Sequence, residues 1–236
     1  MRLQFRNDRV LAVVAHPDDA ELLCAGTLAR AADDGAGVGV VILCQGDRGQ
    51  TNPPTEDLAS IRKREATKAA ELVGAELLFG GIPDGTLADV PEQRQMVVEL
   101  LRQFRPTLVI AHAPNDYHAD HRAASRLAET ASWFAASHGH QTESSVLEQV
   151  PGLWYMDTVG MSGFDAGFYI DICSYVEVKR RMLRFHESQL ARGNDQSFSA
   201  LEAMMLQQCA ARGEQAGVGA AEAFRWAGTW KRTLAF

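Results

Sequence analysis

The sequence has few cysteines, and their positions fix neither a fold nor a metal site. Its 236 residues contain four, which lie far apart and form no CxxC pair: Cys24, Cys44, Cys173 and Cys209. This spacing indicates neither a disulfide framework nor a thiolate metal site. Cys24 and Cys44 fall within apolar segments, where a free cysteine packs as a small hydrophobic residue.

Long apolar segments are also missing. The first eight residues lack the apolar core of a secretion signal, and no later stretch approaches the roughly 20 apolar residues of a membrane span. We therefore expect a soluble, cytoplasmic protein without a membrane anchor.

Basic residues are too few for a general nucleic-acid binder. The chain has 23 lysines and arginines against 30 acidic residues, a formal net charge of -7. Binding to phosphates needs a basic surface. The charge balance therefore argues against a nucleic-acid partner and favours a small polar substrate, while the sequence leaves open whether the chain forms a homo-oligomer.

Strand-like and helical spacings of apolar residues alternate along the first half of the chain. Strand-like runs at residues 10–15, 38–43, 76–79 and 107–111 are separated by helical segments. This alternation predicts an α/β fold with a Rossmann-like, mostly parallel sheet and helices on both faces. The length and the 46% hydrophobic content predict a single domain over residues 1–236.

The pattern weakens beyond about residue 140. There we expect strands near residues 153–156 and 168–172 and a helix over residues 175–185. Residues 46–56, 139–145 and 193–197 gather Gly, Pro, Ser, Asn and Asp without apolar periodicity, which predicts loops.

A polar segment, His16-Pro-Asp-Asp-Ala-Glu, directly follows the first predicted strand and opens the first predicted helix. Ligands of open α/β sheets bind at the carboxyl ends of strands, which favours a functional role for these side chains. Aspartate beside a helix N-terminus is also a common cap. On this segment alone, capping and ligand binding of Asp18 and Asp19 are equally consistent with the sequence.

A second polar segment, His118-Ala-Asp-His121, follows the predicted strand at residues 107–111 and also precedes a helix. Both segments therefore lie at carboxyl ends of strands, where they can meet. Together they offer imidazoles and carboxylates, the donor set of a catalytic zinc that has three protein ligands and an open position for water.

The two motifs together resemble those of the LmbE-like, or PIG-L-like, family of zinc-dependent de-N-acetylases. Further segments match family landmarks in the same order, so that the resemblance covers nearly the whole chain: RKRE at 62–65, IPDG at 82–85, HESQ at 186–189 and GVGAAEAF at 217–224. One departure is Ala119, which stands where family members commonly have proline.

The resemblance implies a role for each motif residue. His16, Asp19 and His121 would bind one Zn²⁺ per chain, and another divalent metal such as Fe²⁺ is left open. Asp18 would act as general base on the water, and His118 would face the substrate carbonyl.

We expect Asp120 to hold His118 protonated, so that His118 stabilises the oxyanion beside the metal. The sequence leaves open which residue protonates the leaving amine. Weaker candidates for substrate contacts are polar residues that surface charge or turn formation explains equally well: Arg48, Arg62, Asp84, Asp116 and Tyr117. His186 is a further candidate from the late helix, although a lone histidine is more often a packing or surface residue.

The predicted function is zinc-dependent hydrolysis of the N-acetyl amide of an amino-sugar conjugate, which releases acetate and a free amine. Alternatives are a hydrolase of a different N-acyl substrate and a non-catalytic zinc-binding protein. Structural zinc sites are usually closed by four protein ligands, often thiolates, whereas Asp18 and His118 here flank three candidate ligands. A nucleotide-binding protein is disfavoured because the glycines at 35–39 precede a predicted strand and not a helix.

Overall fold

A seven-stranded sheet forms the centre of the molecule. The computed structural model describes residues 4–50, 54–190 and 201–228. The strands are β1 (Arg9–Val14), β2 (Gly37–Cys44), β3 (Glu76–Ile82), β4 (Leu108–Ala111), β5 (Gly152–Met156), β6 (Phe168–Asp171) and β7 (Ala221–Trp226). They lie in the order β3-β2-β1-β4-β5-β7-β6, in which β1 to β5 pair in parallel and β7 is antiparallel to both of its neighbours.

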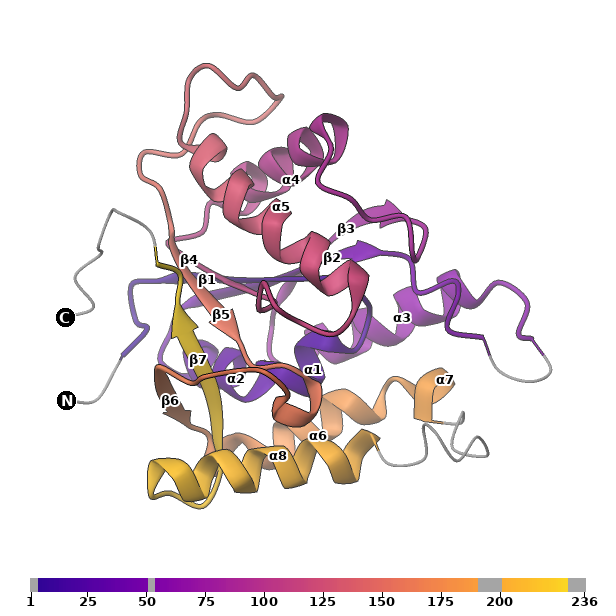
Figure 1. Cartoon of the computed structure of the whole chain (residues 1–236), viewed down its shortest axis with the longest axis vertical. Helices are drawn as coiled ribbons and strands as arrows, with labels where there is room; N and C mark the ends of the chain where they lie inside the picture. The colour runs from indigo at the N-terminus through magenta and orange to yellow at the C-terminus, as the bar shows by residue number, and fades with distance from the viewer. Residues whose placement is uncertain (1–3, 51–53, 191–200, 229–236) are drawn as a thin grey trace.

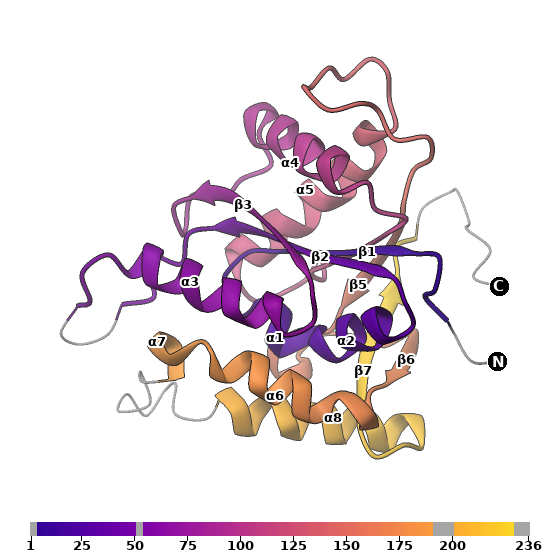
Figure 2. The same cartoon turned by 180° about the vertical axis from the view of Figure 1, so that it is seen from behind.

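Helices cover both faces of this sheet (Figures 1 and 2). On one face lie α4 (Pro91–Phe104) and α5 (Ala119–Ala135). The other carries α1 (Asp19–Leu23), α2 (Ala25–Asp33), α3 (Leu58–Glu71), α6 (Val176–Arg184), α7 (Glu187–Leu190) and α8 (Leu201–Ala216). The predicted α/β fold, with a mostly parallel sheet between two helical layers, is confirmed.

The two layers explain why the central strands are apolar without interruption. In β1, Leu11 and Val13 belong to the core beneath α4 and α5, whereas Val10, Ala12 and Val14 belong to the core on the other face. All five side chains are fully buried. Parallel strands that are buried on both faces carry such runs, and their carboxyl ends then lie at one edge of the sheet.

The C-terminal part of the fold was not fully predicted. The sequence interpretation placed no helix at α8 and no strand at β7, although β7 inserts between β5 and β6. Of the predicted loops, residues 193–197 and part of 46–56 lie outside the described residues.

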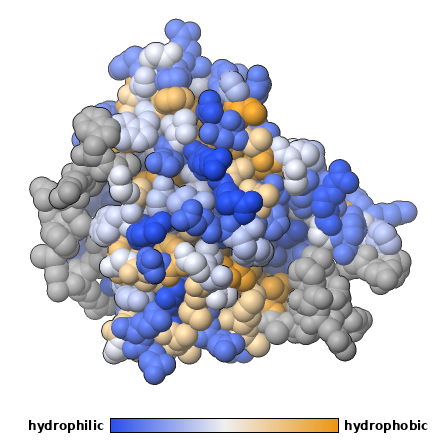
Figure 3. Space-filling model, viewed as in Figure 1, coloured by the Kyte–Doolittle hydropathy of each residue, from blue (hydrophilic) through white to orange (hydrophobic). Residues whose placement is uncertain are grey.

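Polar and apolar side chains are interspersed on the face of the molecule in Figure 3. Among the helices that the structure describes, none combines the length and the apolar character needed to cross a membrane.

A buried ion pair ties the C-terminal elements to α2. Nζ of Lys179 on α6 lies 2.6 Å from Oε1 of Glu222 on β7. The Lys179 ammonium also donates to the carbonyl of Leu22 at 3.0 Å. The Glu222 carboxylate accepts the backbone N–H groups of Gly26 and Thr27 at 2.9 and 2.7 Å. Glu222 therefore satisfies donors at the start of α2, which has no side-chain cap of its own.

Replacing Lys179 with methionine should destabilise the fold by about 3–5 kcal/mol, because it leaves the buried Glu222 charge without its partner. The control is Arg184→Met on the same helix, where the ion pair with Glu202 is partly exposed and should contribute little. Chemical denaturation of both variants measures the difference. Equal stabilities would mean that the buried pair contributes no more than the surface one.

Candidate active site

The site begins in a sharp turn after β1. His16 and Pro17 lead from the strand into α1, and Asp18 has a left-handed backbone with φ of 103°. Non-glycine residues seldom adopt this conformation, and those that do concentrate at functional sites. The turn is held locally, because the His16 N–H donates to the Asp19 carboxylate at 2.7 Å.

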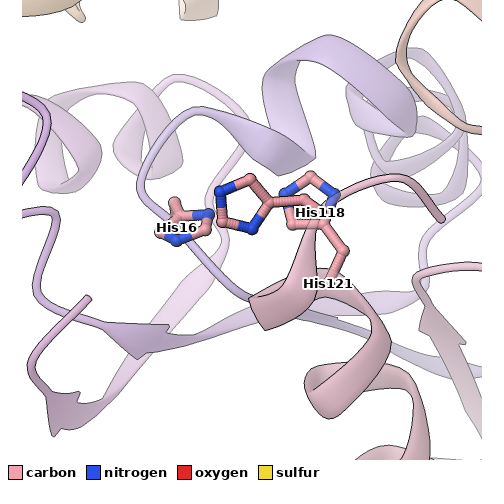
Figure 4. Close-up of side chains that lie close together, drawn as sticks. All are labelled: His16, His118 and His121. Atoms are coloured by element: carbon pink, nitrogen blue, oxygen red, sulfur yellow. The ribbon is translucent and has the colours of Figure 1, made fainter. Parts of the chain in front are cut away.

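Three predicted ligands meet at the carboxyl ends of β1 and β4. Asp19 lies between two imidazoles, with Oδ2 3.4 Å from Nδ1 of His16 and Oδ1 3.2 Å from Nε2 of His121. Figure 4 shows the rings of His16, His118 and His121 gathered at the start of α5. Donor atoms of these three histidines lie within 4.8 Å of one another. The arrangement offers the nitrogen and carboxylate donors that suit a catalytic zinc.

Each candidate ligand histidine has a carboxylate on its other ring nitrogen. Nε2 of His16 lies 3.1 Å from Oδ2 of Asp120, and Nδ1 of His121 lies 3.1 Å from Oδ1 of Asp116. Metal-binding histidines commonly donate to a carboxylate in this way, which fixes the ring and makes it a better ligand. The residues present therefore fit a divalent metal at Nδ1 of His16, Asp19 and Nε2 of His121.

The electrostatics of the donor cluster also favour a cation. Burial lowers the pKa of His16, but Asp120 and Asp19 outweigh it and raise that pKa to about 10. At His121, burial is likewise outweighed, chiefly by Asp19 and Asp116, and the pKa rises to about 9. A cluster of carboxylates that draws two protons onto neighbouring rings is one in which a divalent cation can replace those protons.

The candidate base lies beside these donors. Oδ1 of Asp18 is 3.1 Å from Nη2 of Arg62, a buried side chain on α3. Arg62 also donates to the carbonyls of Pro17 and Gly46, so it holds the turn and the β2–α3 loop together. Burial raises the pKa of Asp18, and the positive charge of Arg62 opposes that shift.

Comparison with known proteins identifies the family. The model of the family described as PIG-L, GlcNAc-PI de-N-acetylase, matches residues 11–132, which contain both motifs. The chain belongs to the PIG-L family.

Similar proteins carry more than one activity in their names. The diacetylchitobiose deacetylase of Thermococcus kodakarensis is 28% identical over 193 residues, which cover 77% of this chain and 70% of that protein. The 4-oxalmesaconate hydratase of Pseudomonas putida is 29% identical over 149 residues, or 60% of this chain and 58% of that protein. Among solved structures, a conserved protein of Thermus thermophilus is 32% identical with a TM-score of 0.78, covering 96% of this chain and 99% of that one.

One expected contact of this PIG-L member is not formed. The Asp120 carboxylate faces His16 and accepts a hydrogen bond from the N–H of Gly85 at 2.9 Å. The contact between Asp120 and His118 is instead made by the backbone: the Asp120 N–H donates to Nδ1 of His118 at 3.2 Å. Burial, followed by the neighbouring His121 and His16, lowers the pKa of His118. Asp120 therefore does not charge His118 as predicted. With Nδ1 accepting, the neutral ring carries its proton on Nε2 and remains a donor.

Three of the weaker substrate-contact candidates make contacts within the protein. Arg62 is engaged by backbone carbonyls and Asp18, and the Asp84 carboxylate accepts the N–H groups of Gly46 and Arg48 at 2.7 and 3.1 Å. His186 is fully buried and lies 3.4 Å from Glu21.

Two of these candidates remain accessible. Tyr117 is 64% exposed and its ring centroid lies 5.9 Å from those of His118 and His121. The Arg48 side chain is exposed and lies 3.3 Å from Asp47.

Sequence reasoning missed His112. Its ring stacks on that of His121 with centroids 3.9 Å apart and 16° between planes, and its Nε2 lies 3.2 Å from Asp19. Nε2 accepts the Ala15 N–H at 3.1 Å, and burial together with His121 lowers the pKa of His112 to about 4. This neutral ring supports the plane of His121. Its position directly after β4 was the available signal.

Substitution Asp120→Asn should weaken metal binding by about 10–100-fold, because it removes the carboxylate that fixes His16. Competition with a chromophoric chelator measures the affinity. The matched control is Asp89→Asn, whose carboxylate pairs with Arg94 on α4. If both variants bind metal as the wild type does, the Asp120 carboxylate does not support the ligand.

Proposed function

We propose that this protein is a metal-dependent N-deacetylase, with zinc as its metal, that hydrolyses the N-acetyl amide of a small amino-sugar conjugate. The observation that carries the proposal is the meeting of His16, Asp19 and His121 beside Asp18 in a PIG-L family chain. A spare carboxylate next to three donors favours catalysis over a closed structural site.

The reaction needs an attacking water, stabilisation of a tetrahedral oxyanion and a proton for the amine. A divalent metal, when bound, supplies Lewis acidity that polarises the carbonyl and lowers the pKa of water to about 7. Asp18 accepts the proton of the attacking water, and Arg62 fixes its carboxylate for that transfer. The proton that the water gives up balances the one that the departing amine takes. Nε2–H of His118 donates to the developing oxyanion as a neutral hydrogen-bond donor.

Two exposed side chains and the names of the relatives support a substrate class. The exposed ring of Tyr117 offers a flat apolar face with a hydroxyl, and the exposed side chain of Arg48 offers a charged donor. The family's description and the name of the Thermococcus relative both refer to N-acetylated glucosamine compounds. These features support a sugar that carries an acetamido group.

The test is a substrate panel on zinc-loaded protein. N-acetylglucosamine, diacetylchitobiose and an N-acetylglucosaminyl inositol are each assayed for release of a primary amine, and an unsaturated dicarboxylic acid is assayed for hydration by loss of ultraviolet absorbance. We expect amine release from at least one acetamido sugar and no hydration. Hydration without amine release would instead support the chemistry named for the Pseudomonas relative.

A further inference from the structure

Cys44 lies at the carboxyl end of β2, next to the turn that carries His16. Its N–H donates to the carbonyl of Ala15 at 2.7 Å, which draws the end of β2 against the end of β1. The side chain is 1% exposed and belongs to no part of the proposed hydrolysis. A buried thiol thus lies beside His16 and Asp120.

Three different donor types meet there. One ligand atom from each of three residues lies within 4.8 Å of the other two: the sulfur of Cys44, a ring nitrogen of His16 and a carboxylate oxygen of Asp120. Within this group, Nε2 of His16 lies 3.1 Å from Oδ2 of Asp120. Zinc bonds of about 2.0–2.3 Å hold tetrahedral ligands about 3.3–3.8 Å apart, so side-chain rotations of modest size close the set around an ion.

We propose that Cys44, Asp120 and Nε2 of His16 form a second metal site, which takes a thiophilic divalent cation such as Zn²⁺ or Cd²⁺. A thiolate with an imidazole and a carboxylate selects such ions over Mg²⁺ or Ca²⁺. Burial, followed by the negative charges of Asp120, Asp84 and Asp19, raises the pKa of the Cys44 thiol, and a cation bound between these groups offsets that repulsion and stabilises the thiolate.

Filling this site inhibits the enzyme. The ion takes the sulfur and Nε2 as ligands, and the protons of the thiol and of Nε2 pass to solvent. The hydrogen bond between His16 and Asp120, which fixes a ligand of the first metal, is then lost. Because Nε2 must lose its proton from a ring that already binds the first metal through Nδ1, the second site is weaker than the first, and only excess metal fills it. The inhibition rests on the proposed function, whereas the binding does not.

The test is a cadmium titration of the metal-depleted full chain, followed by equilibrium dialysis and by the ultraviolet charge-transfer band of a cadmium–thiolate bond. The wild type should bind two equivalents, and the band should grow with the second. Cys44→Ser and Cys44→Ala should each bind one equivalent without the band. Cys173→Ser, at the exposed cysteine, is the control and should behave as the wild type does.

In a parallel titration, zinc replaces cadmium and the turnover of the enzyme is measured after each addition. The second equivalent should lower the wild-type rate by roughly 10-fold or more, the scale for losing the support of a ligand, and Cys44→Ser should resist that loss. A wild type that binds one equivalent without a thiolate band would overturn the proposal, as would a band that persists in both Cys44 variants. Failure of the proposed deacetylation would leave these binding readouts intact.

Discussion

Substitution Asp18→Asn lowers turnover by about 10²–10⁴-fold and leaves the metal content unchanged, the expected result of removing a positioned general base. Asparagine keeps the shape of the side chain and tolerates the left-handed backbone of this position better than most residues. The loss therefore reports on the carboxylate and not on the turn. Steady-state rates of metal-loaded variant and wild type provide the measurement.

Asp57→Asn is the control for this experiment. Asp57 also has a left-handed backbone, with φ of 53°, and precedes α3 at an exposed position outside the donor cluster. It should retain wild-type turnover. Near-normal turnover in metal-loaded Asp18→Asn protein would assign the base to another residue.

Replacement of His121 by alanine should reduce the bound metal from about one equivalent to almost none, because a site with three protein ligands loses one of them. Turnover should fall with it. His118→Ala is the matched control at the start of the same helix, and it should keep its metal while losing oxyanion stabilisation. Elemental analysis after dialysis, with circular dichroism to confirm folding, measures both variants. A folded His121→Ala protein with full metal occupancy would contradict the ligand assignment.

The first half of the fold could be predicted because each strand–helix unit has its own apolar signal. The uninterrupted run of β1 and the periodic residues of α4 are local features, and the rule that parallel strands align their ends then places the two motifs together. The segment Ala221–Trp226 has no such signal, since AEAFRW mixes small, charged and aromatic residues. It is a strand because β5 and β6 pair with it, and that pairing is tertiary.

The residue types of the site could be predicted, but their partners could not. Sequence spacing suggested that Asp120 supports its neighbour His118. In the structure His118 occupies the N-cap of α5 and accepts the N–H of Asp120, while the helix directs the carboxylate toward His16 on another segment. His112 was missed for a similar reason, since its stacking on His121 depends on how β4 and α5 pack.

The most direct test of the central claim is the metal dependence of amide hydrolysis by the wild-type protein. Three samples are incubated with the acetamido sugar that the panel selects: untreated enzyme, chelator-treated enzyme, and chelator-treated enzyme to which one equivalent of zinc has been restored. The amine and the acetate that each sample releases are both measured. The metal-free enzyme should release neither product, and the enzyme with restored zinc should release equal amounts of amine and acetate. Undiminished release by verified metal-free enzyme, or none after full zinc occupancy is restored, would contradict that claim.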